Sequence, residues 1–481
     1  MEKLNYKRMI IAMGLFTFIA ILFFTPKDEN ATFWYAIAVG GLMVLFWLFE
    51  VVPIYVTALF PFVLALPLGV LDSSDLTAAY GHKYIYLFFG GFVLSLGLEK
   101  WDVHKQIAEA IIRVVGTSKA RILLGFLLST GLLSMWISNT ATALMMLPMA
   151  MAVLSKVEKK GKSKFSVFLL LAVAYGASVG GMATLVGSPP NILMAGILED
   201  KHGIVVDFIS WMKIGLPLSL TLLTLVYLFF YLFLGKERYE KLHEVHEEKK
   251  KWTTNQLRVI TIFLTVVFLW SFRTLLTKHT GISYTDEGVA VLGAIMLFFL
   301  PGKKKGEKLL EWKDTSRLPW GILILFGGGL ALAKMLEING VINELTSVFE
   351  SYANTSLLIL LTVLVLISIF GTEIMSNMAL VSVFIPVVAE FALDTDYSII
   401  QLCMPITLAA SCAFMLPVGT PPNAIVFSSG QLKISQMTKN RFENSHIIIL
   451  ISHRENIIVN DYITFMNIIT ILIQNNFTNW S

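Results

Sequence analysis

Long runs of apolar residues separated by short polar stretches dominate the sequence. One helical crossing of a bilayer needs roughly 20 apolar residues, and several of the runs are shorter than this, so we expect interrupted helices beside complete spans. The pattern predicts an all-α polytopic membrane protein. The clear apolar segments lie at about 9–24, 33–50, 52–70, 84–99, 121–137, 141–155, 166–182, 213–235, 257–275, 288–300, 320–336, 357–375, 379–393 and 400–416.

The composition supports a lipid environment. Of the 481 residues, 56% are hydrophobic and 15% are charged, whereas a soluble domain carries about 25% charged residues. So few polar side chains cannot coat a globule in water. The apolar segments and their loops account for about ten or eleven spans, so we expect one integrated membrane domain.

The basic residues show how the chain is oriented. Lys and Arg concentrate in short runs at 156–164, 236–251 and 303–313, which flank apolar segments. This is the pattern of cytoplasmic loops under the positive-inside rule, and it does not resemble a nucleic-acid-binding surface. The first apolar segment follows a basic N-terminus and lacks a small-residue cleavage site, which favours a retained helix with a cytoplasmic N-terminus. We expect a multi-pass protein of the bacterial cell (inner) membrane, with no nucleic-acid partner.

Signatures of enzymes and metal centres are missing from the sequence. It has no HExxH or Gly-x-Ser-x-Gly motif, and its eight histidines lie mainly in loops and the C-terminal tail, so a membrane enzyme is a remote alternative. Cys403 and Cys412 stand nine residues apart in one apolar stretch, outside any CxxC motif. We expect two buried thiols with no disulfide or metal role.

Two glycine-containing segments resemble each other. Residues 84–99 carry Gly90 and Gly91 near their middle, and residues 320–337 carry a run of three glycines. An amphipathic stretch follows each segment, at 101–115 and at 338–349. We predict two glycine-broken hairpins, each followed by an interfacial helix.

The resemblance continues downstream as an internal duplication. Ser138-Asn139 follows Gly90 by 48 residues, and Ser376-Asn377 follows Gly327 by 49. Gly-Ser-Pro-Pro-Asn (187–191) then follows the first pair, and Gly-Thr-Pro-Pro-Asn (419–423) the second. Two repeats with interrupted helices are the best sequence indication of a transporter's binding site, whereas a passive channel would favour a continuous polar pore. The predicted organisation is N-terminal scaffold helices (1–79), repeat 1 (80–195), scaffold helices with a cytoplasmic linker (196–316), repeat 2 (317–427) and an atypical C-terminal tail (428–481).

The duplicated polar turns carry the candidate chemistry. Ser138, Asn139 and Thr140 can unwind the backbone and cap a helix that starts near Ala141. The Pro-Pro pairs break their helices more firmly. Unwound backbone in a bilayer is tolerated where it lines a cavity or is buried in protein; its carbonyls can hold a cation, while helix N-termini favour an anion.

The electrostatics of these turns favour a co-bound cation. None of the four turns contains Arg, Lys or His. A dianionic ligand would therefore depend on helix dipoles and bound sodium ions for neutralisation. Glu373 lies inside an apolar stretch, three residues before Ser376. It is expected either to hold positive charge near a second sodium position or to accept a hydrogen bond from a neighbouring helix.

The paired motifs resemble those of the divalent anion/sodium symporters over about residues 30–440. The resemblance implies eleven transmembrane helices with two inverted repeats, re-entrant hairpins and broken helices, in a homodimer that works as an elevator. It implies sodium-coupled uptake of a small dianion, such as the C4-dicarboxylates succinate, malate and fumarate. The implied sodium ligands are Ser134, Ser138, Asn139 and Gly187 for one ion and Thr372, Met375, Asn377 and Gly419 for the other. The implied substrate contacts are Ser138, Asn139, Thr140, Ser188, Ser376, Asn377, Thr420 and Pro421.

Two features depart from the family pattern. Met378 stands where dicarboxylate members typically have Thr, so sulfate or another tetrahedral dianion remains an alternative, as does anion exchange. The composition also changes after about Asn440, and the most apolar later stretch, Tyr462 to Thr478, contains four Asn or Gln residues. We hypothesise that residues 441–481 are a frameshifted or otherwise altered reading of the last helix; a native last helix is the alternative.

Overall fold

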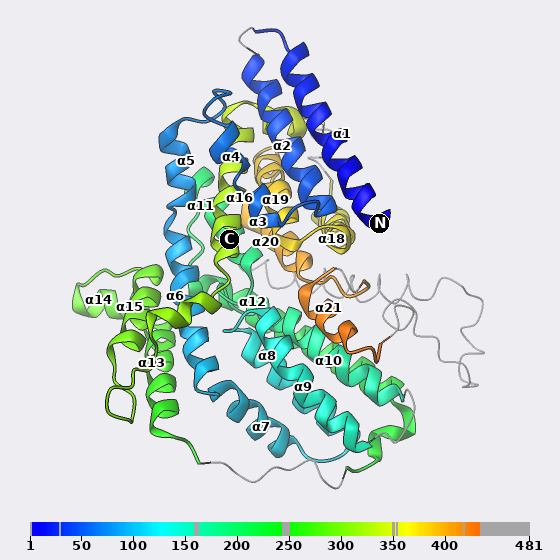
Figure 1. Cartoon of the computed structure of the whole chain (residues 1–481), viewed down its shortest axis with the longest axis vertical. Coiled ribbons are helices and arrows are strands. Elements are labelled where there is room, and N and C mark those ends of the chain that lie inside the picture. Colours follow the sequence, from blue (N-terminus) through cyan, green and yellow to red (C-terminus); the bar gives the residue numbers. More distant parts are fainter. Residues whose placement is uncertain are drawn as a thin grey trace, which may run out of the picture.

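The computed structural model describes residues 2–27, 30–157, 163–242, 251–348, 352, 355–416 and 419–432 (Figure 1). The regular elements of these residues are helices. The 441–481 tail lies outside them, so the hypothesis about its reading frame stays a prediction. The first helices are α1 (Glu2–Phe24), α2 (Ala31–Phe49), α3 (Ile54–Thr57), α4 (Phe60–Leu64), α5 (Ser73–Tyr80), α6 (Lys83–Lys100) and α7 (Val103–Val115).

The remaining helices fall into three groups along the chain. The first is α8 (Lys119–Ser134), α9 (Asn139–Val157), α10 (Lys164–Gly181), α11 (Pro189–His202) and α12 (Phe208–Phe233). The second is α13 (Thr254–Ser271), α14 (Arg273–Thr280), α15 (Asp286–Phe299), α16 (Trp320–Ile338) and α17 (Val341–Ser347). The third is α18 (Leu357–Ile374), α19 (Asn377–Leu393), α20 (Ile399–Ala410) and α21 (Pro421–Ser428).

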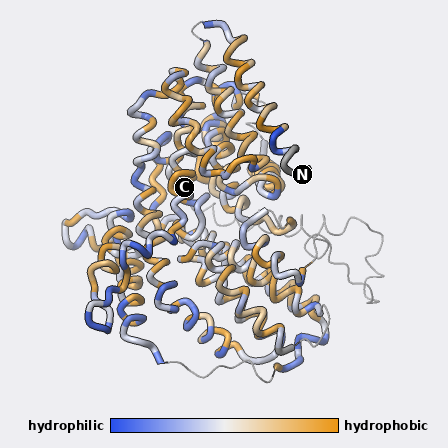
Figure 2. Tube along the Cα trace, in the orientation of Figure 1, coloured by the Kyte–Doolittle hydropathy of each residue, from blue (hydrophilic) through white to orange (hydrophobic). Residues whose placement is uncertain are grey.

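The helices match a bilayer in length and composition. Among the described residues, seven helices are long and apolar enough to cross a membrane, and four shorter apolar helices accompany them. In Figure 2, hydrophobic colouring runs along α1 and α2, whereas α7 and the connections around α13 are more hydrophilic. The predicted all-α membrane architecture is confirmed. The seven long spans are α1, α2, α10, α12, α13, α16 and α18.

The predicted glycine-broken hairpins at 84–99 and 320–337 are wrong. Each segment is one continuous helix, α6 or α16. Their glycines allow close helix packing: a Cβ at Gly90 would collide with the backbone of Ala290. Likewise, a Cβ at Gly327 would collide with Tyr80. Small residues at such crossings let membrane helices approach closely. The helices predicted to follow these segments are present as α7 and α17.

The first helical hairpin is formed by α8 and α9, with its tip at residues 135–138. Helices α8 and α10 run parallel, since Lys119 at the start of α8 lies over the Phe165 ring and Ser134 at its end bonds to Ala177 O. The first residue of α9 contacts the last residue of α10, and α9 ends shortly before α10 begins. Helix α9 therefore runs back along α8.

The second hairpin, α18 and α19, repeats this arrangement. Ser368 Oγ donates to Ile406 O over 2.8 Å and Thr372 Oγ1 to Ala410 O over 2.8 Å, so α18 and α20 run parallel. Helix α19 connects the end of α18 to the start of α20 and must run in the opposite direction. The tip of this hairpin is Met375-Ser376. Both hairpins thus place a Ser-Asn pair of the duplicated motif at the tip.

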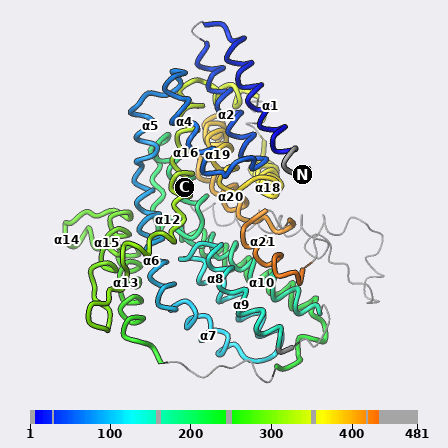
Figure 3. The backbone as a smooth tube through the Cα atoms, in the orientation of Figure 1, coloured from blue at the N-terminus to red at the C-terminus, as the bar shows by residue number. Residues whose placement is uncertain are grey.

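The chain leaves the helical conformation between α10 and α11 (the first break) and between α20 and α21 (the second break). The two broken helices, α10–α11 and α20–α21, interlock. Helix α21, after the second break, packs against α9 and α10, while α11, after the first break, packs against α19 and α20. Figure 3 shows α21 beside α10. Tyr175 of α10 also donates its hydroxyl to Phe414 O at 3.1 Å. Each repeat therefore packs the half-helix after its break against the other repeat.

Candidate functional site

Three oxygen atoms converge at the tip of the first hairpin. Ser134 Oγ lies 2.7 Å from Asn139 Oδ1 and 2.7 Å from Ala177 O. A serine hydroxyl has a single proton, whereas the other two atoms are acceptors. One proton shared among three clustered oxygens leaves lone pairs that a cation could satisfy. Ser134 is fully buried, and Asn139 is partly buried.

The second hairpin has the same cluster. Thr372 Oγ1 lies 2.6 Å from Asn377 Oδ1 and 2.8 Å from Ala410 O. Again the hydroxyl belongs to the last turn of the first hairpin helix, the amide to the first residue of the second, and the carbonyl to the end of the broken helix. The duplication inferred from the sequence therefore places matching side chains in matching contacts.

Serine caps fix the start of each returning helix. Ser138 Oγ accepts from Ala141 N at 3.3 Å, and Ser376 Oγ accepts from Ala379 N at 3.2 Å. An N-cap side chain satisfies a backbone N–H that the helix itself leaves free. The capping predicted for the first motif is confirmed, and the second motif shares it.

Glycines bring the first break against the first tip. A Cβ at Gly187 would lie 2.6 Å from Gly181 O and 3.0 Å from Met135 O. A Cβ at Gly181 would overlap Asn139 Oδ1. The bare backbone of both glycines is therefore required for contact with the tip. The structure thus places the predicted residues Gly187 and Asn139 around the same residue, Gly181.

The second break is held by Glu373. Its carboxylate accepts from Met415 N at 2.8 Å and from Leu416 N at 2.9 Å, and the residue is 3% exposed. Of the two roles predicted for Glu373, hydrogen-bond acceptor is the one observed, with donors just beyond the end of α20. A Cβ at Gly419 would lie 2.8 Å from Glu373 Oε2, so the predicted ligand Gly419 packs against this carboxylate.

The predicted substrate contacts differ in accessibility. Ser138, Asn139, Ser376 and Asn377 are partly buried, as is the predicted sodium ligand Met375. Thr140 and Pro421 are exposed. Ser188 and Thr420, at the starts of α11 and α21, are buried, and Thr420 Oγ1 accepts from Asn423 N.

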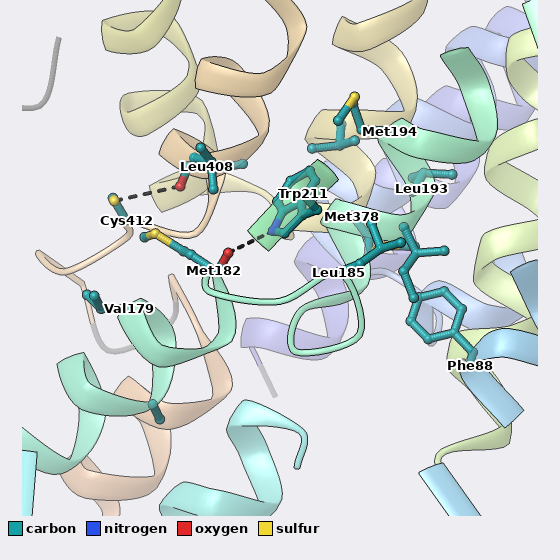
Figure 4. Close-up of a cluster of buried hydrophobic side chains, with 14 of the residues drawn as sticks. Phe88, Val179, Met182, Leu185, Leu193, Met194, Trp211, Met378, Leu408 and Cys412 are labelled. Atoms are coloured by element: carbon teal, nitrogen blue, oxygen red, sulfur yellow. Dashed lines mark hydrogen bonds between the residues drawn. The ribbon is translucent and has the colours of Figure 1, made fainter. Parts of the chain in front are cut away.

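An apolar cluster joins the two repeats beside these turns (Figure 4). It includes Met182 and Leu185 from the first break, Leu408 from α20 and Cys412 just after it, and Met378 from the second motif. Met378 is 7% exposed, so its thioether is part of this packing. Cys403 and Cys412 are both buried, as predicted.

The predicted ligand set omitted several residues that shape the site. Ala177, Ala410 and Gly181 contribute through backbone atoms, and a sequence pattern does not identify such contacts. Asn191 and Asn423 carried a usable signal, because each ends a duplicated Pro-Pro-Asn motif. Their side chains donate into the breaks at 2.8–3.1 Å.

Comparison with known proteins identifies the chain. A family model described as citrate transporter matches residues 44–401. The sodium-dependent dicarboxylate transporter SdcS of Staphylococcus saprophyticus is 36% identical over 444 residues, covering 88% of this chain and 85% of the relative. The chain belongs to this family of sodium-dependent dicarboxylate and citrate transporters. The resemblance noted in the sequence is confirmed, and the protein is a transporter rather than an enzyme.

Further relatives agree with this family assignment. SdcS of Staphylococcus aureus strain USA300 is 35% identical over 453 residues, covering 90% of this chain and 87% of the relative. Among solved structures, the YdaH transporter of Alcanivorax borkumensis aligns with a TM-score of 0.55 at 11% identity, covering 83% of this chain and 89% of that chain. At this identity the likeness shows a shared fold only. The family supports a multi-pass protein of the bacterial cell (inner) membrane.

Proposed function

We propose that this transporter couples the sodium gradient to uptake of a small divalent anion, such as the C4-dicarboxylates succinate, malate and fumarate. The observation that carries the proposal is the duplicated oxygen cluster, Ser134 with Asn139 and Thr372 with Asn377. Sodium ions take hard oxygen ligands, and broken membrane helices supply them from hydroxyls, amides and carbonyls. The SdcS relatives are sodium-dependent dicarboxylate transporters, which supports the same ion and substrate class.

In this proposal the anion binds next to the sodium ions, at the four polar turns. The four polar turns contain no Arg, Lys or His, so two sodium ions and the N-termini of α9, α11, α19 and α21 would offset the charge of a dianion. Ser138, Asn139, Thr140, Ser376, Asn377 and Pro421 are the proposed substrate contacts. Ser188 and Thr420 contribute as residues that start the half-helices. The homodimer and the elevator motion implied by the family resemblance remain part of this proposal.

Citrate is a second candidate, favoured by the description of the matching family model. The test is uptake of radiolabelled succinate into proteoliposomes with and without an inward sodium gradient, with unlabelled citrate, malate or sulfate as competitors. Sodium-dependent succinate uptake supports the proposal. Uptake that requires internal anion but no sodium would indicate an exchanger. If citrate or sulfate inhibits succinate uptake more strongly than malate does, citrate or sulfate would replace the C4-dicarboxylates as the proposed substrate.

A further inference from the structure

Two buried oxygen atoms without a hydrogen-bond partner occupy equivalent places in the two repeats. Among the described residues, Asn191 Oδ1 and Asn423 Oδ1 are buried and accept no hydrogen bond. Both asparagines are 0% exposed. Burial of an acceptor without a donor is unfavourable, because the hydrogen bonds it made to water are lost and not replaced. The same unsatisfied atom in both repeats therefore points to a shared ligand.

The orientation of each amide is fixed by its other end. Asn191 Nδ2 donates to Gly181 O at 3.1 Å and to Thr184 O at 2.9 Å. Asn423 Nδ2 donates to Ala413 O at 2.8 Å and to Leu416 O at 3.1 Å. In both cases the acceptors lie ten and seven residues before the asparagine. Turning the amide over would place two carbonyls against an oxygen, so Oδ1 cannot exchange places with Nδ2.

The amide nitrogens of both asparagines bond to residues that contact the helical hairpins. Gly181, whose carbonyl accepts from Asn191, also packs directly against Asn139 Oδ1. In the second repeat, Leu416 accepts from Asn423 through its carbonyl and donates through its N–H to Glu373. Through its amide nitrogen, each asparagine is therefore held by a residue that contacts a helical hairpin, Gly181 through Asn139 and Leu416 through Glu373.

The available ligand atoms select the kind of ion. Around the first break they are amide, hydroxyl and carbonyl oxygens, and the described residues contain no cluster of three His, Cys, Asp or Glu side chains. Neutral oxygen donors suit a monovalent hard cation, whereas zinc prefers nitrogen and sulfur ligands. We propose that Asn191 Oδ1 and Asn423 Oδ1 are direct sodium ligands, one in each repeat. This assignment rests on the proposed sodium coupling and extends the ligand set expected from the motifs.

The test measures sodium binding by purified, substrate-free protein, using ²²Na⁺ titration and the rise in melting temperature when NaCl replaces choline chloride. Asn191→Ala and Asn423→Ala should each weaken sodium binding by at least roughly tenfold, a loss typical of groups in or around a metal site. Asn339→Ala is the matched control. Its Nδ2 also donates to two carbonyls, Val70 O at 2.8 Å and Met335 O at 2.7 Å, but the duplicated motifs do not include it, so sodium binding should be unchanged.

Asn191→Asp and Asn423→Asp distinguish two roles of these asparagines: binding sodium through Oδ1, and holding the break through the bonds that Nδ2 donates. Aspartate keeps an oxygen at this position but loses both donated hydrogen bonds. Retained sodium binding with an altered Na⁺/Li⁺ preference supports the ligand role, and this pair also serves if the alanine variants do not fold. Wild-type sodium affinity in the alanine variants would overturn the ligand role. This result is expected if water, and not sodium, bonds to the amide oxygens. The ligand role would also be overturned by aspartate variants that keep the wild-type melting temperature in choline chloride but bind sodium as weakly as the alanine variants. Because no substrate is added, failure to carry succinate leaves this result intact.

Discussion

Thr372 and Asn377 are joined by a 2.6 Å hydrogen bond across the tip of the second hairpin. It fixes the end of α18 to the first residue of α19. The equivalent bond in the first repeat, from Ser134 to Asn139, is 2.7 Å long. A contact repeated at two sites 238 residues apart in sequence marks a function that both repeats share.

Replacing Thr372 tests this contact. Thr372→Val keeps the shape but removes the hydroxyl from the oxygen cluster, so the sodium concentration for half-maximal uptake should rise roughly tenfold. Thr372→Ser retains the hydroxyl and should stay within about threefold of wild type. Both values come from uptake measured over a range of sodium concentrations. Wild-type sodium dependence in Thr372→Val would remove this cluster from the coupling mechanism.

Gly181→Ala should abolish uptake, because the new methyl group would displace Asn139 Oδ1 from the first cluster. Overpacking of this kind costs about 1–3 kcal/mol. Gly41→Ala is the control: nothing lies within 4 Å of its built Cβ, and alanine is favoured within a helix. Uptake by Gly41→Ala should match wild type. Active Gly181→Ala would show that the tip tolerates a shifted asparagine.

Glu373→Gln should destabilise the second break by about 1–3 kcal/mol, since one of two backbone N–H donors would lose its acceptor. The melting temperature in detergent should fall, and sodium affinity should fall with it because Gly419 packs on this carboxylate. Glu344→Gln, at an exposed position of α17, should change neither. A fully stable Glu373→Gln protein with wild-type uptake would contradict the positioning role.

Arg273 joins two acidic side chains from different elements. It bonds to Asp207 at 2.9 Å and to Asp286 at 3.0 Å, and the Asp286 side chain is 6% exposed. Arg273→Met would leave the buried Asp286 carboxylate without its cationic partner, so stability should fall. We expect a loss of about 1–3 kcal/mol, smaller than for a fully buried pair, because Arg273 is partly exposed. Lys313→Met removes a pair whose lysine is 78% exposed and should change the melting temperature little. Equal melting temperatures for the two variants would refute this expectation.

Met378→Thr addresses the departure from the family pattern. Because Met378 is buried in the apolar cluster, a hydroxyl there should lower stability by about 1–3 kcal/mol. The order of competition among succinate, malate, citrate and sulfate should stay the same. Melting temperature and competition assays measure the two effects. A new preference among these anions would show that this side chain reaches the substrate.

The sequence by itself determined the membrane class, the duplication and the family. Long apolar runs with few charges leave a chain no stable alternative to lipid burial. Ser138-Asn139 and Ser376-Asn377 could be recognised because both their order and their spacing recur. These properties depend on residue identity and order along the chain.

The tertiary structure decided where the chain turns back and which atoms meet. Gly90 and Gly327 suggested breaks, but they lie in continuous helices because a helix interior tolerates glycine where another backbone packs closely. The contacts of Asn191 with Gly181 O and of Glu373 with Leu416 N join side chains to backbone atoms. Every residue other than proline carries the same backbone N–H and C=O groups, so only the packing of the folded helices selects which of them a side chain reaches.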